Sequence, residues 1–156
     1  MLLGFKRQFA PFVEDGSKFH SVRGFRKVSP RVGETAHCYV DPRQKTMRLL
    51  GRWPVVRVDP ITLDMTKCGI SYTLRITIAD HTLSLDEASA FAWRDGFRDG
   101  DQSLKRTALD EMARFWIADG RLTDALDSRP WHGQVIFWDP AKTIPATTVP
   151  QKGVSN

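Results

Sequence analysis

Hydrophobic and polar side chains alternate most regularly between residues 72 and 78. A period of two sends successive side chains to opposite faces, so this segment predicts a β-strand with one buried face. Shorter runs rich in β-branched and aromatic residues predict further strands at 1–5, 17–23, 38–40, 47–58 and 131–138. Pro54 interrupts one of these runs and indicates an edge position or a bulge, because proline cannot donate a ladder hydrogen bond.

Helical periodicity is found in three segments, at residues 8–15, 84–94 and 103–118. The second has Ser84 followed three residues later by Glu87, and this spacing is the capping box that begins a helix. Glycine follows the first and third segments closely, as it often does at helix ends. The residues expected on the inner face of the third helix are Leu104, Ala108, Met112, Phe115 and Trp116.

This order of elements predicts an α+β fold, with five or six short strands forming a small, partly closed β-barrel and helices packed at its ends. The chain has 156 residues, a typical length for one domain with its own core. From residue 141 onward apolar periodicity disappears, and Pro, Thr, Lys, Gly and Ser become frequent. We therefore expect one domain over 1–140 and a disordered C-terminal tail over 141–156.

The distribution of charge along the chain is more informative than the net charge of +5. Residues 1–58 contain 12 of the 23 basic side chains and 4 of the 18 acidic ones, which gives +8 there and −3 elsewhere. Such an asymmetry attracts a polyanion, because each Lys or Arg that neutralises a phosphate releases counterions. A solvated basic surface explains the same numbers, and charge does not distinguish RNA from DNA.

Several classes of site are not expected from this sequence. Cys38 and Cys68 lack the CxxC spacing of zinc sites, and four scattered histidines form no recognisable ligand set, so we expect no metal. No glycine-rich phosphate-binding motif is present, and we expect no cofactor. The apolar opening residues are interrupted by Lys6 and Arg7, too early for a signal peptide or a membrane span. This pattern predicts a cytoplasmic protein without a membrane partner.

Four stretches of the chain carry a family resemblance: residues 5–12, 15–23, 32–35 and 92–97. The second reads Asp-Gly-Ser-Lys-Phe-His-Ser-Val-Arg, and together with the aromatic segments near 112–116 and 133–138 the set resembles the ASCH branch of the PUA-like superfamily. The resemblance implies a PUA-like barrel with a basic cleft beside the first helix. It also implies RNA or modified nucleosides as ligands.

The same resemblance implies a second activity, since some small ASCH proteins are amidohydrolases that remove the acetyl group of N(4)-acetylcytidine with a Lys, a Thr and a Glu. By motif position these residues correspond to Lys18, Ser21 and Asp95. Ser keeps the hydroxyl and Asp keeps the carboxylate, although the Asp side chain is one methylene shorter. In this hypothesis Ser21 or a water attacks the acyl carbon, Lys18 is the base, and Asp95 orients or protonates the leaving amine.

The residues themselves set two conditions on that chemistry. A lysine accepts a proton near neutral pH only if burial lowers its pKa. In an ideal strand Lys18 and Ser21 would point to opposite faces, so their meeting requires a bend, for which Gly16 is well placed. Alternatively, Lys18 is a solvated or phosphate-binding cation and Ser21 an ordinary strand hydroxyl.

Three further residues are candidates for ligand binding. Arg23 and Arg26 flank the expected cleft, where a guanidinium could bind a phosphate or stack on a base, although either could also be an ordinary surface arginine. Trp93 neighbours Asp95 and could stack on a base, although tryptophans in such a chain mostly fill the core. The sequence therefore leaves two hypotheses: an RNA or nucleoside-binding domain that uses Lys18, Arg23, Arg26 and Trp93, or an amidohydrolase.

Overall fold

The computed structural model of the protein describes residues 1–68, 71–100, 102–122 and 129–145. Most of the predicted tail, residues 146–156, lies outside this description, so its disorder stays a prediction. Ordered structure continues beyond residue 140, because the backbone N–H of Ile144 donates to the carbonyl of Arg52 at 2.8 Å. In the described part of the chain, no helix combines the length and apolar character needed to cross a membrane.

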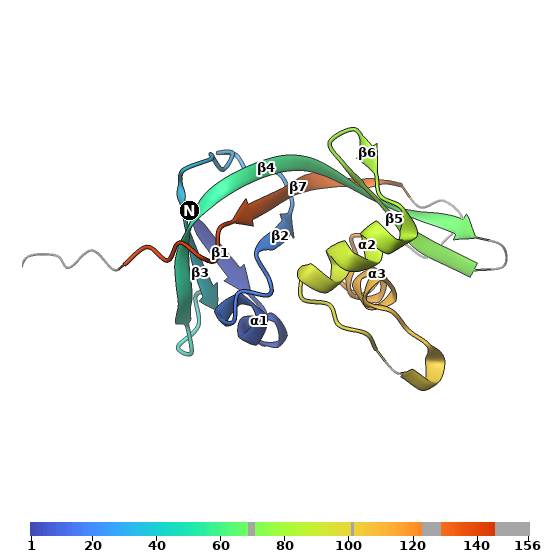
Figure 1. Cartoon of the computed structure of the whole chain (residues 1–156), viewed down its shortest axis with the longest axis horizontal. Coiled ribbons are helices and arrows are strands. Elements are labelled where there is room, and N and C mark those ends of the chain that lie inside the picture. Colours follow the sequence, from blue (N-terminus) through green and yellow to red (C-terminus); the bar gives the residue numbers. More distant parts are fainter. Residues whose placement is uncertain (69–70, 101, 123–128, 146–156) are drawn as a thin grey trace, which may run out of the picture.

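The chain has the predicted α+β composition (Figure 1). In order, its elements are β1 (Leu2–Phe5), a 3-10 turn (Arg7–Phe9), α1 (Ala10–Glu14), β2 (His20–Arg23), β3 (Thr35–Val40), β4 (Arg48–Cys68), β5 (Ser71–Ile78), β6 (His81–Thr82), α2 (Leu85–Arg94), a second 3-10 turn (Gln102–Leu104), α3 (Ala108–Ala118) and β7 (Trp131–Trp138).

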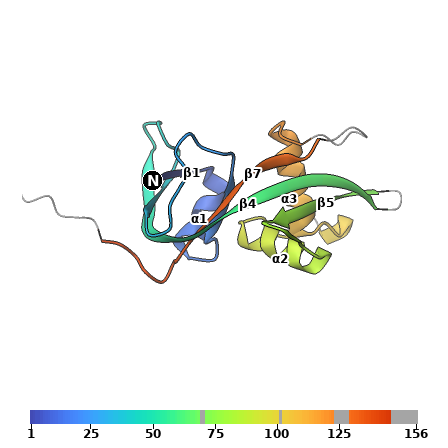
Figure 2. The same cartoon turned by 90° about the horizontal axis from the view of Figure 1, so that it is seen from above.

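The long strand β4 organises the sheet. Its first part pairs with β3, its middle with β7 and its last part with β5, all antiparallel. Figures 1 and 2 show that this strand joins two halves, one with β1, β3 and α1, the other with β5, α2 and α3. The register against β7 shifts between Val55 and Arg57, which confirms the bulge indicated by Pro54. We predicted that this strand ends near residue 58, but it continues to Cys68. The carbonyl of Pro60, within this strand, accepts from the Ala79 N–H at 2.9 Å.

The sheet is not closed, so the predicted partly closed barrel is not confirmed. Among the described residues, β1 pairs only with β3 and β2 pairs only with β7, and no backbone ladder joins β1 to β2. Arginine side chains bridge these two edges instead. Arg23 Nη2 donates to the Gly4 carbonyl at 2.5 Å, and Arg26 Nη2 donates to the Leu2 carbonyl at 3.0 Å. We call this place, between Gly4–Lys6 and Ser21–Arg23, the β1–β2 gap.

Both longer helices begin with a capping box. The predicted one is confirmed: Ser84 Oγ accepts from the Glu87 N–H, and the Glu87 carboxylate accepts from the Ser84 N–H. The start predicted for the last helix was wrong, because a second capping box between Thr107 and Asp110 begins α3 only at residue 108. Leu104 therefore lies in a separate turn and is 65% exposed, whereas we expected it on the inner face.

Candidate functional site

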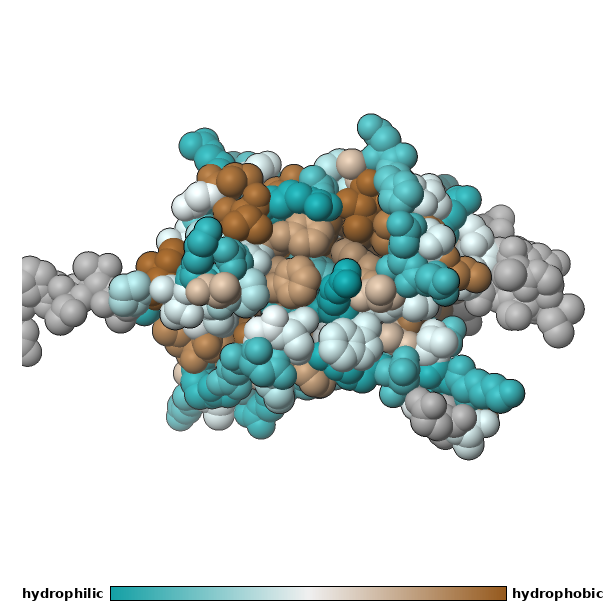
Figure 3. Space-filling view, in the orientation of Figure 1, coloured by the Kyte–Doolittle hydropathy of each residue, from teal (hydrophilic) through white to brown (hydrophobic). Residues whose placement is uncertain are grey.

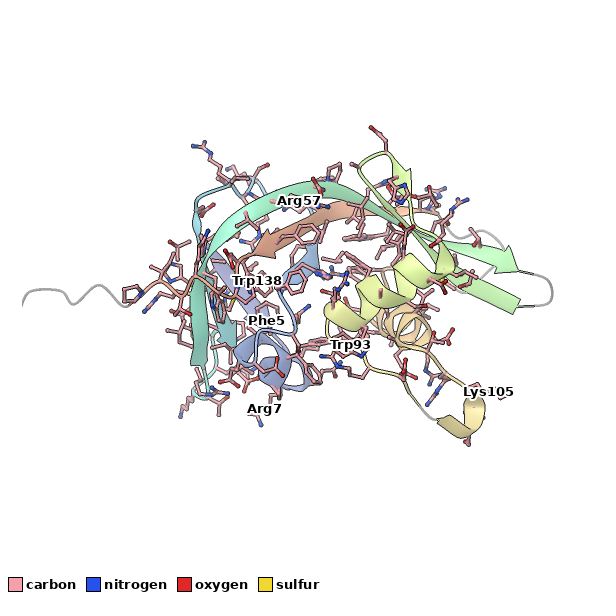
Figure 4. All side chains as sticks on the ribbon, viewed as in Figure 1. Phe5, Arg7, Arg57, Trp93, Lys105 and Trp138 are labelled. Atoms are coloured by element: carbon pink, nitrogen blue, oxygen red, sulfur yellow. The ribbon has the colours of Figure 1, made fainter. Side chains whose placement is uncertain are left out.

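A cavity of about 150 Å³ opens at the β1–β2 gap. Its apolar walls are aromatic and come from β1, the first turn, the segment after α2, and α3; they are Phe5, Phe9, Phe97, Phe115 and Trp116. Its polar groups come from Lys18, Ser21, Arg23 and Asp95, together with charged residues at the mouth. Figure 3 shows apolar surface at the centre of the face between α1 and α2, bordered by hydrophilic side chains, and Figure 4 places Phe5 in this central region.

Lys18 reaches the cavity from the bend between α1 and β2. Gly16 ends the helix at φ +79°, and the Asp15 carboxylate accepts from the Ser17 N–H at 2.8 Å. The Lys18 N–H then donates to the Phe12 carbonyl at 2.7 Å, and β2 begins only at His20. The predicted strand over 17–23 was therefore too long at its start. Because Lys18 precedes the strand, the alternation rule does not separate it from Ser21, and the bend required by the chemistry is present.

Asp95 is positioned by the end of α2. It is the C-cap residue, and Gly96 follows at φ +94° in a Schellman motif, with hydrogen bonds from Phe97 N–H to the Ala92 carbonyl and from Gly96 N–H to the Trp93 carbonyl. A Cβ at position 96 would lie 3.2 Å from Lys18 Cδ and 2.8 Å from the Phe9 ring. Glycine here satisfies the backbone angle and also lets Lys18 come close to the helix end.

The Lys18 ammonium group is fully hydrogen-bonded. It donates to the carbonyl of His20 at 2.9 Å, to the carbonyl of Asp95 at 2.5 Å and to Asp95 Oδ1. These contacts account for its three donor positions. A cation at the C-terminus of α2 also complements the helix dipole. Lys18 and Asp95 are 2% and 5% exposed, so this is a buried ion pair.

Burial moves the two pKa values of this pair toward each other. Desolvation lowers the pKa of Lys18, and the Asp95 charge opposes that shift. Desolvation raises the pKa of Asp95, and the Lys18 charge again opposes the shift. Burial penalises each charged form while the partner stabilises it, so the free energy of moving the proton from Lys18 to Asp95 is smaller than in water.

Ser21 lies at the same cavity but contacts Arg23 rather than Lys18. Its Oγ accepts from Arg23 Nε at 2.9 Å, which leaves its own proton available to a ligand. The Arg23 guanidinium also lies 5.1 Å from the centre of the Phe5 ring. The structure thus brings Lys18, Ser21 and Asp95 to one cavity, with no hydrogen bond between Lys18 and Ser21.

Two predicted binding residues lie outside the cavity wall. Arg26 is exposed and covers the outer part of the β1 edge. Trp93, at the end of α2 in Figure 4, is 44% exposed and carries the Arg98 guanidinium 3.7 Å from its ring centre. Helical geometry turns Trp93 outward, whereas its neighbour Ala92 is fully buried. Stacking of Trp93 on a base in this cavity is not supported by this geometry.

His20 is a functional candidate that sequence reasoning set aside as a packed or exposed ring. It is 1% exposed, it stacks on Phe91 with ring centres 4.4 Å apart, and its Nε2 lies 3.7 Å from Asp95 Oδ1. Burial and the Lys18 charge hold its pKa well below the usual value of 6.5, so the ring is neutral. No pattern in the sequence showed this, because the contacts come from α2.

The charged mouth of the cavity was also missed. Asp119, at the end of α3, pairs with Lys6 at 3.7 Å and with Arg121 at 2.8 Å. The Lys6 ammonium lies 4.5 Å from the centre of the Phe115 ring. These residues follow the ends of β1 and α3, where side-chain direction does not follow from periodicity.

Within the described residues, no three His, Cys, Asp or Glu side chains gather as a metal ion would require. Comparison of the chain with protein-family models, with curated proteins and with solved structures found no match in any of the three. The resemblance to the ASCH family therefore stays a prediction from the motifs.

Proposed function

We propose that the cavity binds a pyrimidine nucleoside, either free or within RNA. The observation that carries this proposal is the meeting of aromatic walls with a fixed set of buried polar groups at the β1–β2 gap. An apolar cavity of about 150 Å³ takes up a ring the size of benzene, and this cavity has a similar volume. One six-membered ring is thus the ligand that its size favours.

The polar groups of the cavity favour a base with the hydrogen-bonding edge of cytosine. Among the described residues no hydrogen bond engages Asp95 Oδ2, so this atom is available to accept from an exocyclic amine, as carboxylates do with the N4 amine of cytosine. The Ser21 hydroxyl can donate to a ring nitrogen or carbonyl. Phe115 and Trp116 line the cavity and would give a base apolar contacts.

Calorimetric titration with cytidine and uridine tests the proposal. We expect cytidine to bind more tightly than uridine. Ser21→Ala should weaken cytidine binding about fivefold, which corresponds to one hydrogen bond of about 1 kcal/mol. Arg43→Glu, on the exposed loop after β3, is the control and should bind like the wild type. Equal affinity of Ser21→Ala and wild type, or no heat with either nucleoside, would contradict the proposal.

Hydrolysis of an acylated nucleoside is a second candidate, favoured by the buried Lys18–Asp95 pair beside the Ser21 hydroxyl. When the shared proton lies on Asp95, Lys18 is a neutral amine that can take a proton from water or Ser21. The oxygen then forms a bond to the acyl carbon, the amide C–N bond breaks, and Asp95 gives its proton to the leaving amine. Water supplies the remaining oxygen and protons of the acid released.

Acetate release from N(4)-acetylcytidine distinguishes this activity from binding alone. We expect Lys18→Arg to abolish turnover, because a guanidinium keeps its proton. Ser21→Ala should also abolish turnover if the hydroxyl is the nucleophile, and only slow it if Ser21 holds a water. Tight binding of N(4)-acetylcytidine by the wild type without acetate release would reject hydrolysis and keep the binding proposal.

A further inference from the structure

Cations extend outward from the cavity along one loop. Residues 16–33 contain five basic side chains and no acidic one. Lys18 is buried, Arg23 is partly buried in the cavity wall, and Arg26 is exposed on the same edge of β1. Lys27 and Arg31 continue the series on the loop between β2 and β3, and both are exposed. We call residues 24–34 the basic loop.

The cations of the basic loop are not neutralised by carboxylates. Among the described residues Arg26, Lys27 and Arg31 form no ion pair, whereas Arg48, Arg75 and many other cations do. Glu34 is the acidic residue of the loop, and it accepts from the amino terminus of Met1 at 3.0 Å. Glu34 also interacts with the Arg26 charge, so within the basic loop one carboxylate opposes three cations, Arg26, Lys27 and Arg31.

Apolar side chains stand between these cations. Phe25, Val28 and Val32 are 65%, 74% and 67% exposed, among the highest values for large hydrophobic residues in the described chain. Pro30, between them, is buried and anchors the loop to the domain. Phe25 thus presents an exposed phenyl ring directly before Arg26 in the basic loop.

We propose that a single-stranded polynucleotide leaves the cavity along the basic loop, with phosphates on Arg26, Lys27 and Arg31 and one base stacked on Phe25. This inference rests on the proposed nucleoside site, and it identifies the ligand as a nucleotide within a strand. Interleaved cations and aromatic rings are how proteins hold single strands. Because the contacts are to phosphates and one base face, they carry little sequence preference.

The continuity of the charge favours a nucleic acid over an anionic membrane surface. A membrane would contact Lys27, Arg31 and the exposed valines, but it could not reach Arg23, which is held against Gly4 in the cavity wall. A strand with one nucleoside in the cavity would pass Arg23 before it reaches the exposed cations Arg26, Lys27 and Arg31. One extended ligand therefore uses the whole series.

The test compares Lys27→Glu/Arg31→Glu with Arg43→Glu/Lys45→Glu, a pair with the same charge change on the exposed loop at the other end of β3. Fluorescence anisotropy with a labelled oligocytidine RNA gives affinity against salt, and the DNA of the same sequence is a second probe. We expect the first variant to reduce the slope of log affinity against log salt by about 1.4, or about 0.7 for each lost contact. The control pair should leave the slope near the wild-type value.

Phe25→Ala tests the stacked base, with Leu104→Ala as the control because both side chains are 65% exposed. We expect Phe25→Ala to weaken RNA binding about tenfold without changing the salt slope, as the loss of one stacked base predicts. Cytidine affinity should be unchanged in both, because neither residue lines the cavity.

The outcomes separate this inference from the function on which it rests. If the wild type binds cytidine but loop and control variants bind RNA equally, the path along the basic loop is wrong and the nucleoside site stands. If the wild type binds neither cytidine nor RNA, both proposals fail. If anionic phosphatidylserine vesicles bind the wild type and RNA does not, the basic loop is a membrane contact and the inference is overturned.

Discussion

Two ion pairs near α1, Lys18–Asp95 and Glu14–Arg48, differ mainly in their contact with water. Lys18 and Asp95 meet in the aromatic cavity, with side chains 3% and 7% exposed. Arg48 and Glu14, the last residue of α1, meet at the surface, with side chains 56% and 38% exposed. The hydrogen bond from Arg48 lowers the pKa of Glu14, whereas burial raises the pKa of Asp95 despite its lysine partner. The surroundings, more than the partner, decide the direction of the shift.

Breaking the buried pair should have the largest effect. Lys18→Met leaves the Asp95 carboxylate buried without its cation, and we expect the free energy of unfolding to fall by about 3–5 kcal/mol. Urea denaturation followed by circular dichroism measures this loss.

The double variant Lys18→Met/Asp95→Leu is the control for that loss. It removes both charges, so it should recover most of the stability, as replacement of buried ion pairs by apolar side chains generally does. A double variant that is less stable than Lys18→Met would contradict the explanation that the loss comes from an unpaired buried Asp95 charge.

Gly96→Ala tests the close approach that makes the buried pair possible. The substitution forces alanine into φ +94° and places Cβ against Phe9 and Lys18, and we expect a loss of about 2–3 kcal/mol. Gly120→Ala is the matched control, because Gly120 has φ +73° but no neighbour within 4 Å of the added Cβ. It should cost about 1 kcal/mol from backbone strain alone. If the two variants lose the same free energy of unfolding, Lys18 and Phe9 can move aside for the added Cβ at little cost.

Acid should destabilise the cavity through His20. Its pKa is lowered in the folded protein, so below pH 6.5 the unfolded chain takes up a proton that the folded chain does not. Stability therefore falls as the pH falls, by up to about 2 kcal/mol at pH 5. The free energy of unfolding at pH 7 and pH 5, for wild type and His20→Phe, measures this contribution.

His37 supplies the control for that measurement, since its pKa is also lowered by partial burial. His37→Gln should keep most of the acid sensitivity, whereas His20→Phe should lose most of it. Surface carboxylates such as Glu14 act only below their usual value of 4.5 and do not enter this range. The same acid sensitivity in wild type and His20→Phe would contradict the assignment.

The smallest effect is expected at the surface pair. Arg48→Ala removes the partner of Glu14, but water and salt already screen this interaction, and the melting temperature should stay close to that of the wild type. Differential scanning calorimetry at low and high salt checks this. A clear drop in the melting temperature that is the same at low and high salt would contradict this prediction, because it would show that salt does not screen the surface pair.

Local signals in the sequence predicted local structure well. Strict alternation predicted β5, and the Ser84–Glu87 spacing predicted the start of α2. Gly16 indicated the bend after which Lys18 lies outside β2. Long-range pairing had no such signal. The extension of β4 beyond residue 58 depends on partners in β5 and β7, and the sequence around Pro60 alone does not indicate them.

The candidate site shows the same difference between local signals and long-range packing. Motif positions singled out Lys18, Ser21 and Asp95, and the structure brings all three to one cavity. The place of His20 against Phe91, and of Asp119 at the mouth, depends on how the helices pack over the β1–β2 gap. Trp93 lies outside the lining of the cavity, because nearness to Asp95 in sequence does not fix which side of α2 a residue occupies.

The pairing of β2 with β7 has a consequence for how the protein is made. Within the described chain β7 is the partner of β2 and is also the last strand to leave the ribosome. Ser21 and Arg23 are synthesised early, yet the ladder that fixes them can form only when residues 134–137 have emerged. Contacts so distant in sequence form slowly, since closing a long loop costs chain entropy before the pairing compensates. The cavity can therefore be completed during synthesis only after β7 has emerged.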